Sequence, residues 1–222
     1  MFSLIKKLIP SFIKSLFWQT YLRFKFHSKN KFGKGICFSK DLMMGKNCRI
    51  GSNVIIGRAV KLGNNVSIGK DVFFENIEIG DYTSVEGRVI CTGYGNGKIK
   101  IGRNSYIGIY NVLDWSDNIT IGDFVHIAGP STGLWTHTSA PMCLNSIPLD
   151  EKSKKYRPTA PIVIESNVYI GGNCTIYPGI KIGHHSIVAP NSAVTKDVPP
   201  YTMVGGVPAK VIKNLPKSDT KC

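Results

Sequence analysis

The residue best suited to acid–base chemistry in this chain is His137, in the run "LWTHTSAP". A neutral imidazole accepts a proton near neutral pH, and a positioned base of this kind is typically worth about 10²–10⁴ in rate. A histidine in a loop can also do no more than form local hydrogen bonds. The surroundings of His137 have to decide between these interpretations.

His137 lies where a regular pattern stops. On both sides of it, apolar residues return every six positions, whereas the run "HIAGPSTGLWTHTSAPMCLNSIPL" (His126–Leu149) opens a break of roughly thirty residues. Loops longer than about 12–15 residues are uncommon in compact domains and are usually functional or disordered. The sequence therefore predicts a functional loop inserted at about residues 132–160.

The regular part of the chain is a hexapeptide repeat. The pattern slips by one residue at Ile77, pauses at the polar insertion "GYGNGK", and resumes after the long break. A second apolar position, usually followed by glycine, comes two residues after each repeat position. The repeat positions are Ile36, Leu42, Cys48, Val54, Val60, Val66 and Val72 before the break, and Ile162, Val168, Cys174 and Ile180 after it.

A six-residue period fits a short strand followed by a tight corner of Gly, Asn or Asp. Three such units make one triangular coil of about 18 residues, and coils stacked about 4.8 Å apart bury a core that no single repeat can bury. A β-sandwich would instead place its turns every 8–12 residues or so. The pattern predicts an all-β parallel β-helix and leaves its handedness open.

The repeats and the closing block "VTKDVPPYTMVGGVPAK" resemble the left-handed β-helix acyltransferases over about residues 36–213. Within that family the chain is similar to the galactoside and maltose acetyltransferases, and particularly to bacterial polysaccharide O-acetyltransferases. The resemblance implies a left-handed coil, a homotrimer, acetyl-CoA as co-substrate, and active sites in clefts between neighbouring prisms.

The same resemblance assigns roles on the acceptor side. It makes His137 the catalytic base that takes a proton from a sugar hydroxyl as the oxygen attacks the thioester. Asp114, in "NVLDWSDNITIGD", matches an acidic residue of the family, and Asn111 matches a family asparagine at a slightly different offset. Asp114 could also be a corner residue that satisfies its own turn. Trp135 is expected to stack on the acceptor sugar or to pack on the loop.

On the donor side the resemblance points to the C-terminal block. The backbone N–H of Gly172 falls where the family places a donor to the thioester oxygen, although a glycine pair can simply form a corner. Thr195, Lys196 and Lys210 match positions that contact the nucleotide end of CoA. Pro190 departs from the family, because it has no N–H where some relatives donate to the pantetheine arm.

The other histidines are not expected to act in catalysis or to bind metal. His126 lies within a repeat unit, and His184 and His185 lie at a corner, where solvent exposure is the simplest expectation. Zinc sites need convergent ligands, and these spacings do not match the three-histidine pattern of β-helix carbonic anhydrases. We expect no metal.

The composition is that of an intracellular enzyme of one domain with short appendages. The 222 residues include six cysteines without paired spacing. A reducing, cytoplasmic location is therefore the simpler expectation, and Cys48 and Cys174 should be small core hydrophobes. Domain boundaries are expected at 1–34, a basic amphipathic segment, 35–213, the β-helix, and 214–222, a polar tail.

The net charge of +14 is concentrated at the N-terminus, where residues 1–34 hold eight Lys or Arg and no acid. On a helical wheel the apolar side chains of residues 1–26 form one broad face and most of the lysines form another. This pattern fits a helix on the inner face of the cytoplasmic membrane, and it equally fits a helix that caps the open end of the solenoid. No nucleic-acid-binding motif accompanies the charge.

Three functions stay open at this point. The leading one is an acetyl-CoA-dependent O-acetyltransferase that modifies a sugar hydroxyl of a bacterial surface polysaccharide or its precursor. The second is N-acetylation of an amino sugar or a xenobiotic. The third is a non-catalytic β-helix scaffold, which would neither bind CoA nor depend on His137.

Overall fold

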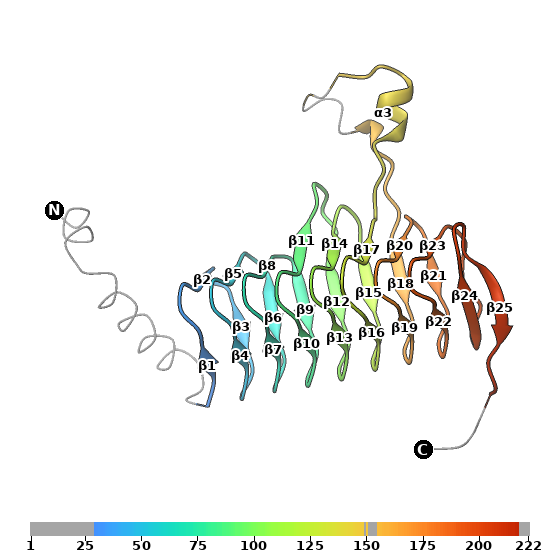
Figure 1. The fold of residues 1–222 in the computed structure, drawn as a ribbon. Coiled ribbons are helices and arrows are strands. Elements are labelled where there is room, and N and C mark those ends of the chain that lie inside the picture. Colours follow the sequence, from blue (N-terminus) through green and yellow to red (C-terminus); the bar gives the residue numbers. More distant parts are fainter. Residues whose placement is uncertain (1–28, 149, 151–154, 218–222) are drawn as a thin grey trace.

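A computed structural model describes residues 29–148, 150 and 155–217. In these ranges the chain forms a left-handed parallel β-helix of about 9 turns with almost no helix, as expected. Successive short strands lie on three sheets, and the coils stack in order from the N-terminus to the C-terminus (Figure 1). The predicted amphipathic helix at residues 1–26 falls outside the described residues.

The three sheets are the faces of a triangular prism. Sheet A holds β1 (Lys31–Phe32), β4 (Arg49–Ile50), β7 (Ser67–Ile68), β10 (Ser84–Val85), β13 (Tyr106–Ile107), β16 (His126–Ile127), β19 (Tyr169–Ile170), β22 (Ile187–Val188), β24 (Thr202–Gly205) and β25 (Lys210–Asn214). Sheet B holds β2 (Cys37–Phe38), β5 (Ile55–Ile56), β8 (Phe73–Phe74), β11 (Ile90–Thr92), β14 (Val112–Asp114), β17 (Gly133–Leu134), β20 (Thr175–Ile176) and β23 (Ala193–Val194). Sheet C holds β3 (Met43–Met44), β6 (Val60–Leu62), β9 (Ile77–Ile79), β12 (Ile99–Ile101), β15 (Ile119–Ile121), β18 (Ile162–Ile164) and β21 (Lys181–Ile182).

The register confirms a coil of 18 residues and explains each irregularity in the sequence. Ile55 pairs with Phe73, 18 positions later, in the regular N-terminal coils. The slip near Ile77 shortens one coil by a residue, and the "GYGNGK" insertion lengthens another. The strands on either side of these irregularities still pair in parallel, because both changes of length fall between strands, at corners of the prism.

The prism core consists of the two apolar positions of each repeat. Val54 and Val66 are fully buried, and Ile56 and Ile68 are 2% exposed. The core contains Cys48 and Cys174, as expected, and burial raises the pKa of both thiols. Stacking is what buries this core, as in other solenoids.

Asparagine and glycine have different structural roles at the corners. Asn53 and Asn65 have positive φ, at 57° for both, a conformation that Asn tolerates better than most residues. Their side chains bond to matching corners of neighbouring coils: the Asn53 amide donates to Asp71 at 3.0 Å, and Asn65 accepts from the Asn47 amide at 3.1 Å. Gly51 instead lies where a Cβ atom would be 2.5 Å from the carbonyl oxygen of Gly69. Glycine is therefore needed there for close stacking.

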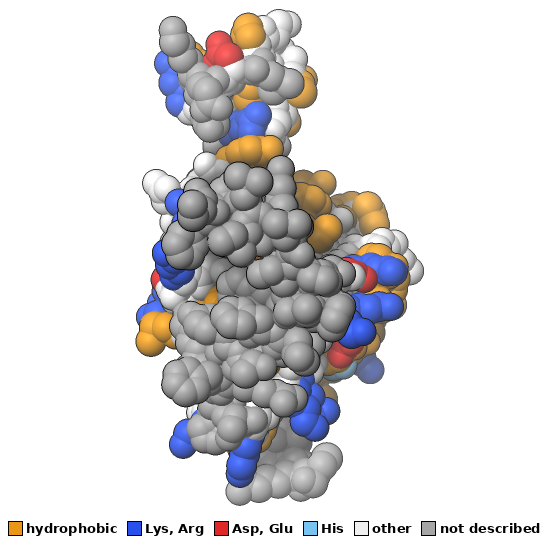
Figure 2. Space-filling model, turned by 90° about the vertical axis from the view of Figure 1, so that its left-hand side faces the viewer, with side chains coloured by type: hydrophobic (Ala, Val, Ile, Leu, Met, Phe, Trp, Pro, Cys, Tyr) orange, Lys and Arg blue, Asp and Glu red, His pale blue; other side chains and the backbone are white. Residues whose placement is uncertain are grey.

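The long loop leaves the prism between β17 and β18, at the edge where sheets B and C meet (Figure 1). Its two ends form a narrow stalk, in which His137 bridges to Thr159 in antiparallel fashion. A short helix at the tip, α3 (Ala140–Leu144), was not predicted from the sequence, and it buries Met142. Seen from the N-terminal end, the loop projects clear of the prism (Figure 2).

Candidate active site

We call the corner between sheets B and C the B–C edge. It includes residues 93–98, 115–118, 135–161 and 177–180, each of which connects a sheet B strand to the next sheet C strand. It also includes residues 195–197, which lead from β23 to Val198, the bridge partner of Ile182 in β21. Asp114 ends β14, and His137 follows β17 one coil later, where Leu113 pairs with Leu134. Stacking therefore brings together an acid and a base that lie 23 positions apart in the sequence.

The two side chains form a tight pair. His137 Nδ1 lies 2.6 Å from Asp114 Oδ2, with 21% of the His137 side chain exposed and none of the Asp114 side chain. Because an ionised carboxylate accepts hydrogen bonds, Nδ1 is the nitrogen that carries the proton. The other nitrogen, Nε2, is then left with its lone pair and can act as a base.

Asp114 is held by more than the imidazole. Its Oδ1 atom accepts hydrogen bonds from the Ser116 N–H at 3.1 Å and the Ser116 hydroxyl at 2.7 Å. Its Oδ2 atom also accepts from the backbone N–H groups of Thr136 at 2.9 Å and His137 at 3.1 Å. Burial raises the pKa of Asp114, but the hydrogen bonds from Ser116 and His137 outweigh it, so the pKa lies below its usual value.

Sequence reasoning missed Ser116 and Thr136. Ser116 Oγ lies 3.2 Å from His137 Nδ1, and Thr136 Oγ1 donates to the Asp114 carbonyl oxygen at 2.6 Å. The run "DWS" does carry a signal, since Asp often accepts a hydrogen bond from the backbone two residues on. Ser116 is not arranged as a nucleophile, because it faces the protonated Nδ1 rather than Nε2.

The structure does not bring Asn111 to this pair. Asn111 is fully buried at the opposite end of β14, three residues or about 10 Å along the strand from Asp114. Its side-chain amide donates to the Ala128 carbonyl at 3.2 Å, and its oxygen accepts from the Thr132 N–H at 2.9 Å. These bonds hold a corner of the next coil. A catalytic role for Asn111 stays a prediction that this geometry does not support.

Trp135 lies on the B–C edge and is 36% exposed. A Cβ atom on Gly133 would lie 2.3 Å from the Trp135 Nε1 atom, so the indole lies across Gly133. This accounts for a glycine within β17. Part of the ring remains exposed, and its role in binding the acceptor stays a prediction.

Gly172 lies on a different edge, between β19 and β20 where sheets A and B meet. A Cβ atom there would be 2.6 Å from the Gly129 carbonyl oxygen, so the glycine permits close stacking on the previous coil. Within one chain Gly172 and His137 are separated by the full width of sheet B. A shared role would need two chains.

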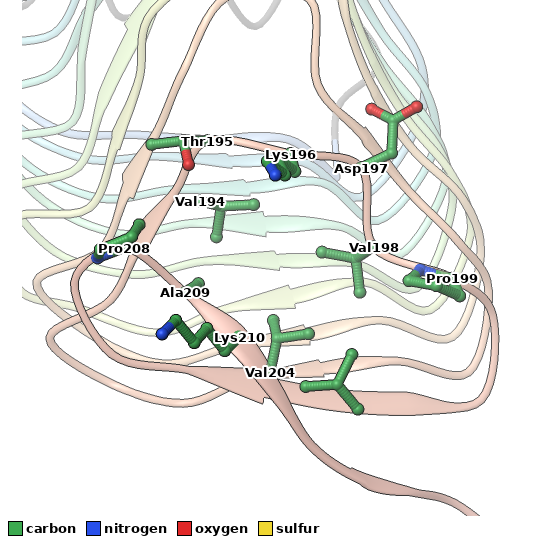
Figure 3. A pocket seen from close by; sticks show the side chains of 11 residues that line it. Val194, Thr195, Lys196, Asp197, Val198, Pro199, Val204, Pro208, Ala209 and Lys210 are labelled. Carbon is green, nitrogen blue, oxygen red and sulfur yellow. The ribbon is translucent and has the colours of Figure 1, made fainter.

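Thr195, Lys196 and Lys210 line one pocket of about 320 Å³ near the C-terminal end of the prism (Figure 3). Val194 and Val198 form part of its apolar wall. Thr195 and Lys196 follow β23, which pairs through β20 with β17, so they lie two coils from the His137 loop. Two coils correspond to about 10 Å along the prism.

The remaining histidines do not join this site. His126 lies on sheet A between the rings of Tyr106 and Tyr169, with centroids 4.5 Å and 5.3 Å away. His184 and His185 lie together near Tyr201, where sheets C and A meet. Within the described ranges, no group of three or more His, Cys, Asp or Glu side chains could hold a metal ion.

Comparisons with known proteins agree with this architecture. A family model described as bacterial transferase hexapeptide (six repeats) matches residues 161–196, and one described as hexapeptide repeat of succinyl-transferase matches residues 42–73. The solved structure of AntD, an N-acyltransferase from Bacillus cereus with bound dTDP and 3-hydroxybutyryl-CoA, matches with a TM-score of 0.54 at 20% identity. It covers 90% of this chain and 89% of AntD, a similarity of fold.

Two curated relatives from Escherichia coli (strain K12) are more similar in sequence. Galactoside O-acetyltransferase is 36% identical over 141 residues, which is 64% of this chain and 65%, just under two thirds, of that protein. WbbJ, which is named for O-acetyl transfer in lipopolysaccharide biosynthesis, is 32% identical over 154 residues, covering 57% of this chain and 76% of that protein. The chain therefore belongs to the bacterial hexapeptide-repeat transferases, as an enzyme of their acetyl-transferring class.

Proposed function

We propose that this protein is an acetyl-CoA-dependent O-acetyltransferase whose acceptor is a sugar hydroxyl of a bacterial surface polysaccharide or its precursor. The observation that carries the proposal is the His137–Asp114 pair, which leaves Nε2 free on the same edge that holds Thr195 and Lys196. The names of two relatives, one for galactosides and one for lipopolysaccharide biosynthesis, support a sugar acceptor.

The chemistry is a direct transfer with no acyl-enzyme intermediate. His137 Nε2 takes the proton of the acceptor hydroxyl while its oxygen attacks the thioester carbonyl. The imidazolium that forms is stabilised by the buried Asp114 carboxylate. As the tetrahedral intermediate collapses, the C–S bond breaks, Nε2–H returns the proton to the sulfur, and the products are an acetyl ester and free CoA.

Acetyl-CoA is proposed to lie along the B–C edge on the C-terminal side of His137. Thr195, Lys196 and Lys210 would bind its nucleotide end, since ammonium groups are suited to phosphates. The acceptor would then approach from the side of Trp135. CoA and the acceptor would meet at Nε2, where the proton has to be transferred.

A homotrimer would complete the site. Gly172 can donate its N–H to the thioester oxygen beside His137 only if the two residues come from different chains. Sheet B offers a surface for such contact, because its exposed residues Ile55, Phe73 and Ile90 form an apolar row. Sheet C instead carries charged pairs on its outer face, such as Lys61 with Glu78 at 3.0 Å.

A peripheral location at the inner face of the cytoplasmic membrane remains part of the proposal. It rests on the basic amphipathic residues 1–26, which lie outside the described structure. Among the residues that are described, no helix has the length and apolar character needed to span a membrane. Capping of the first coil by the same segment is the competing proposal.

The test is release of CoA from acetyl-CoA by the wild-type protein and His137→Ala with a panel of bacterial glycans. Acceptor-dependent release that falls at least about a hundredfold in the variant would support the proposal. Acetate released from the product by mild alkali would mark an ester rather than the amide of N-acetylation. Acceptor-dependent release at equal rates from both proteins would contradict the role of His137, and failure to bind CoA would favour a scaffold.

A further inference from the structure

Ser116, like Thr136, is a residue of this site that the sequence analysis did not identify. It is 8% exposed and lies two residues after Asp114, in the corner between β14 and β15 at the B–C edge. Its hydroxyl donates to Asp114 Oδ1 at 2.7 Å and lies 3.2 Å from His137 Nδ1. One short side chain therefore touches both members of the acid–base pair.

The two oxygens of Asp114 have different partners. Oδ1 bonds to the N–H and hydroxyl of Ser116, whereas Oδ2 faces His137 and Thr136. The Ser116 bonds therefore fix the rotation of the carboxylate, and that rotation sets the direction of the Oδ2 bond to the imidazole. If a buried carboxylate loses a hydrogen-bond donor, it either rotates toward another donor or keeps an unsatisfied oxygen, which lowers the stability of the folded protein.

Ser116 also contacts the loop of residues 93–97, the "GYGNG" insertion one coil earlier. The Tyr94 N–H donates to Ser116 Oγ at 3.3 Å. A Cβ atom on Gly95 would lie 1.8 Å from the Ser116 carbonyl oxygen, and one on Gly93 would lie 2.6 Å from the Ser116 nitrogen. The glycines of this insertion therefore allow the loop to lie directly on Ser116.

The same loop meets the long loop that carries His137. The guanidinium of Arg157 lies over the ring of Tyr94, 5.3 Å from its centroid, and Tyr94 is 69% exposed. Residues 93–97 thus form a loop on the N-terminal side of the pair, exposed at Tyr94 and Asn96, and Ser116 bonds both to this loop and to Asp114.

We propose that Ser116 is a positioning residue, which fixes the Asp114 carboxylate against His137 and makes the alignment of this pair depend on the loop of residues 93–97. The proposal rests on the proposed function for its catalytic consequence. The structural part of the proposal, that the Ser116 hydrogen bonds fix the Asp114 carboxylate, can be tested without measuring activity.

The first test compares the stability of Ser116→Ala with that of Ser105→Ala. Ser105 is a matched control, because it is 3% exposed and its hydroxyl donates to the Gly122 carbonyl at 3.1 Å, with no carboxylate involved. In Ser116→Ala the Asp114 pKa should rise, since burial is then opposed by fewer bonds. The stability lost in Ser116→Ala should be greatest at neutral pH and should shrink as the pH falls through the raised pKa of Asp114 in the variant toward its lowered pKa in the wild type, which lies below the ordinary aspartate value of about 3.9.

The loss in Ser105→Ala should not change with pH. Equal pH dependence of the two variants would overturn the proposal. If Ser116→Ala does not fold, Ser116→Thr supplies the comparison, since it keeps the hydroxyl and should keep the pH dependence of the wild-type protein.

The second test is kinetic. Ser116→Ala should lower kcat about 10- to 100-fold with little change in KM for acetyl-CoA, as expected for loss of a bond to a charged group. The acidic limb of its plot of kcat against pH should move to lower pH, because a misaligned Asp114 stabilises the imidazolium less. Gly95→Ala, which keeps the Ser116 side chain but forces the loop and the Ser116 backbone apart, should move the same limb in the same direction.

If the acidic limb of the kcat–pH plot of Ser116→Ala coincides with that of the wild type, Ser116 does not position Asp114. If the limb of Gly95→Ala coincides with that of the wild type, the alignment of the pair does not depend on the loop. If the wild-type protein transfers no acetyl group but the stability test gives the expected pH dependence, the proposed function fails and the hold of Ser116 on Asp114 stands.

Discussion

His137 Nδ1 lies 2.6 Å from Oδ2 of Asp114, and the Asp114 side chain is fully buried. A buried carboxylate with this many donors is ionised at neutral pH, and it fixes both the tautomer and the orientation of the imidazole. The geometry of the proposed base is therefore set before any substrate binds.

Replacing His137 by alanine should lower kcat about 10²–10⁴-fold with little effect on the KM for acetyl-CoA. The reason is that only proton transfer from the acceptor is lost. His185→Ala, at the edge between sheets C and A, should keep the wild-type rate. Steady-state release of the CoA thiol measures both, and a fall of less than about tenfold in His137→Ala would argue for another base.

Asp114→Asn should lower kcat about 10²-fold or more, because an amide cannot stabilise the imidazolium as a carboxylate does. Its NH₂ group would also face the donors of Ser116 or Thr136. Circular dichroism should show a folded protein with a reduced melting temperature. Full activity in a folded Asp114→Asn variant would contradict a role for the charge.

The lowered pKa of Asp114 also predicts how stability depends on pH. A group whose folded pKa lies below its unfolded value of about 3.9 contributes its stability fully above that pH and loses it as the pH falls through the folded value. The difference in unfolding free energy between wild type and Asp114→Asn should therefore be larger at pH 7 than at pH 3. Urea denaturation at the two pH values measures it, and a constant difference would contradict the shift.

Lys196→Ala and Lys210→Ala should each raise the KM for acetyl-CoA by about three- to tenfold and leave kcat nearly unchanged. A single phosphate contact of this kind is exposed and partly screened by salt. The effect should disappear with acetyl-pantetheine, which has no nucleotide. Lys100→Ala, on the outer face of sheet C, is the control, and equal KM values for all the proteins would remove the C-terminal pocket from CoA binding.

Ile170→Ala should destabilise the solenoid by about 2–5 kcal/mol, because the side chain is fully buried in the prism core and its loss leaves a cavity. Ile212→Ala, on a strand where that side chain is 57% exposed, should change stability by less than about 0.5 kcal/mol. Denaturant unfolding compares the two variants. Equal losses of unfolding free energy in the two variants would contradict the assignment of the core from the repeat.

Much of the fold could be predicted because the hexapeptide repeat is a local signal. The period alone indicates which residues point inward, so Val54, Val66 and Cys174 could be assigned to the core from their positions in the repeat. The prediction of His137 and Asp114 as site residues needed family resemblance as well, since either residue type is common in loops and corners. Their functional roles stay predictions, although the structure does bring them together.

The sequence by itself determined the coil, its 18-residue length, its core and the position of the long loop. Only the tertiary structure decided which side chains of different coils meet, because that depends on how the insertions at 93–98 and 135–161 leave the stack. It joined Ser116 and Asp114 to His137 while placing Gly172 on another edge and Asn111 at the far end of β14. The physical reason is that a repeat specifies a residue's direction within its own coil, whereas contacts at an edge form between coils and through loops that carry no repeat.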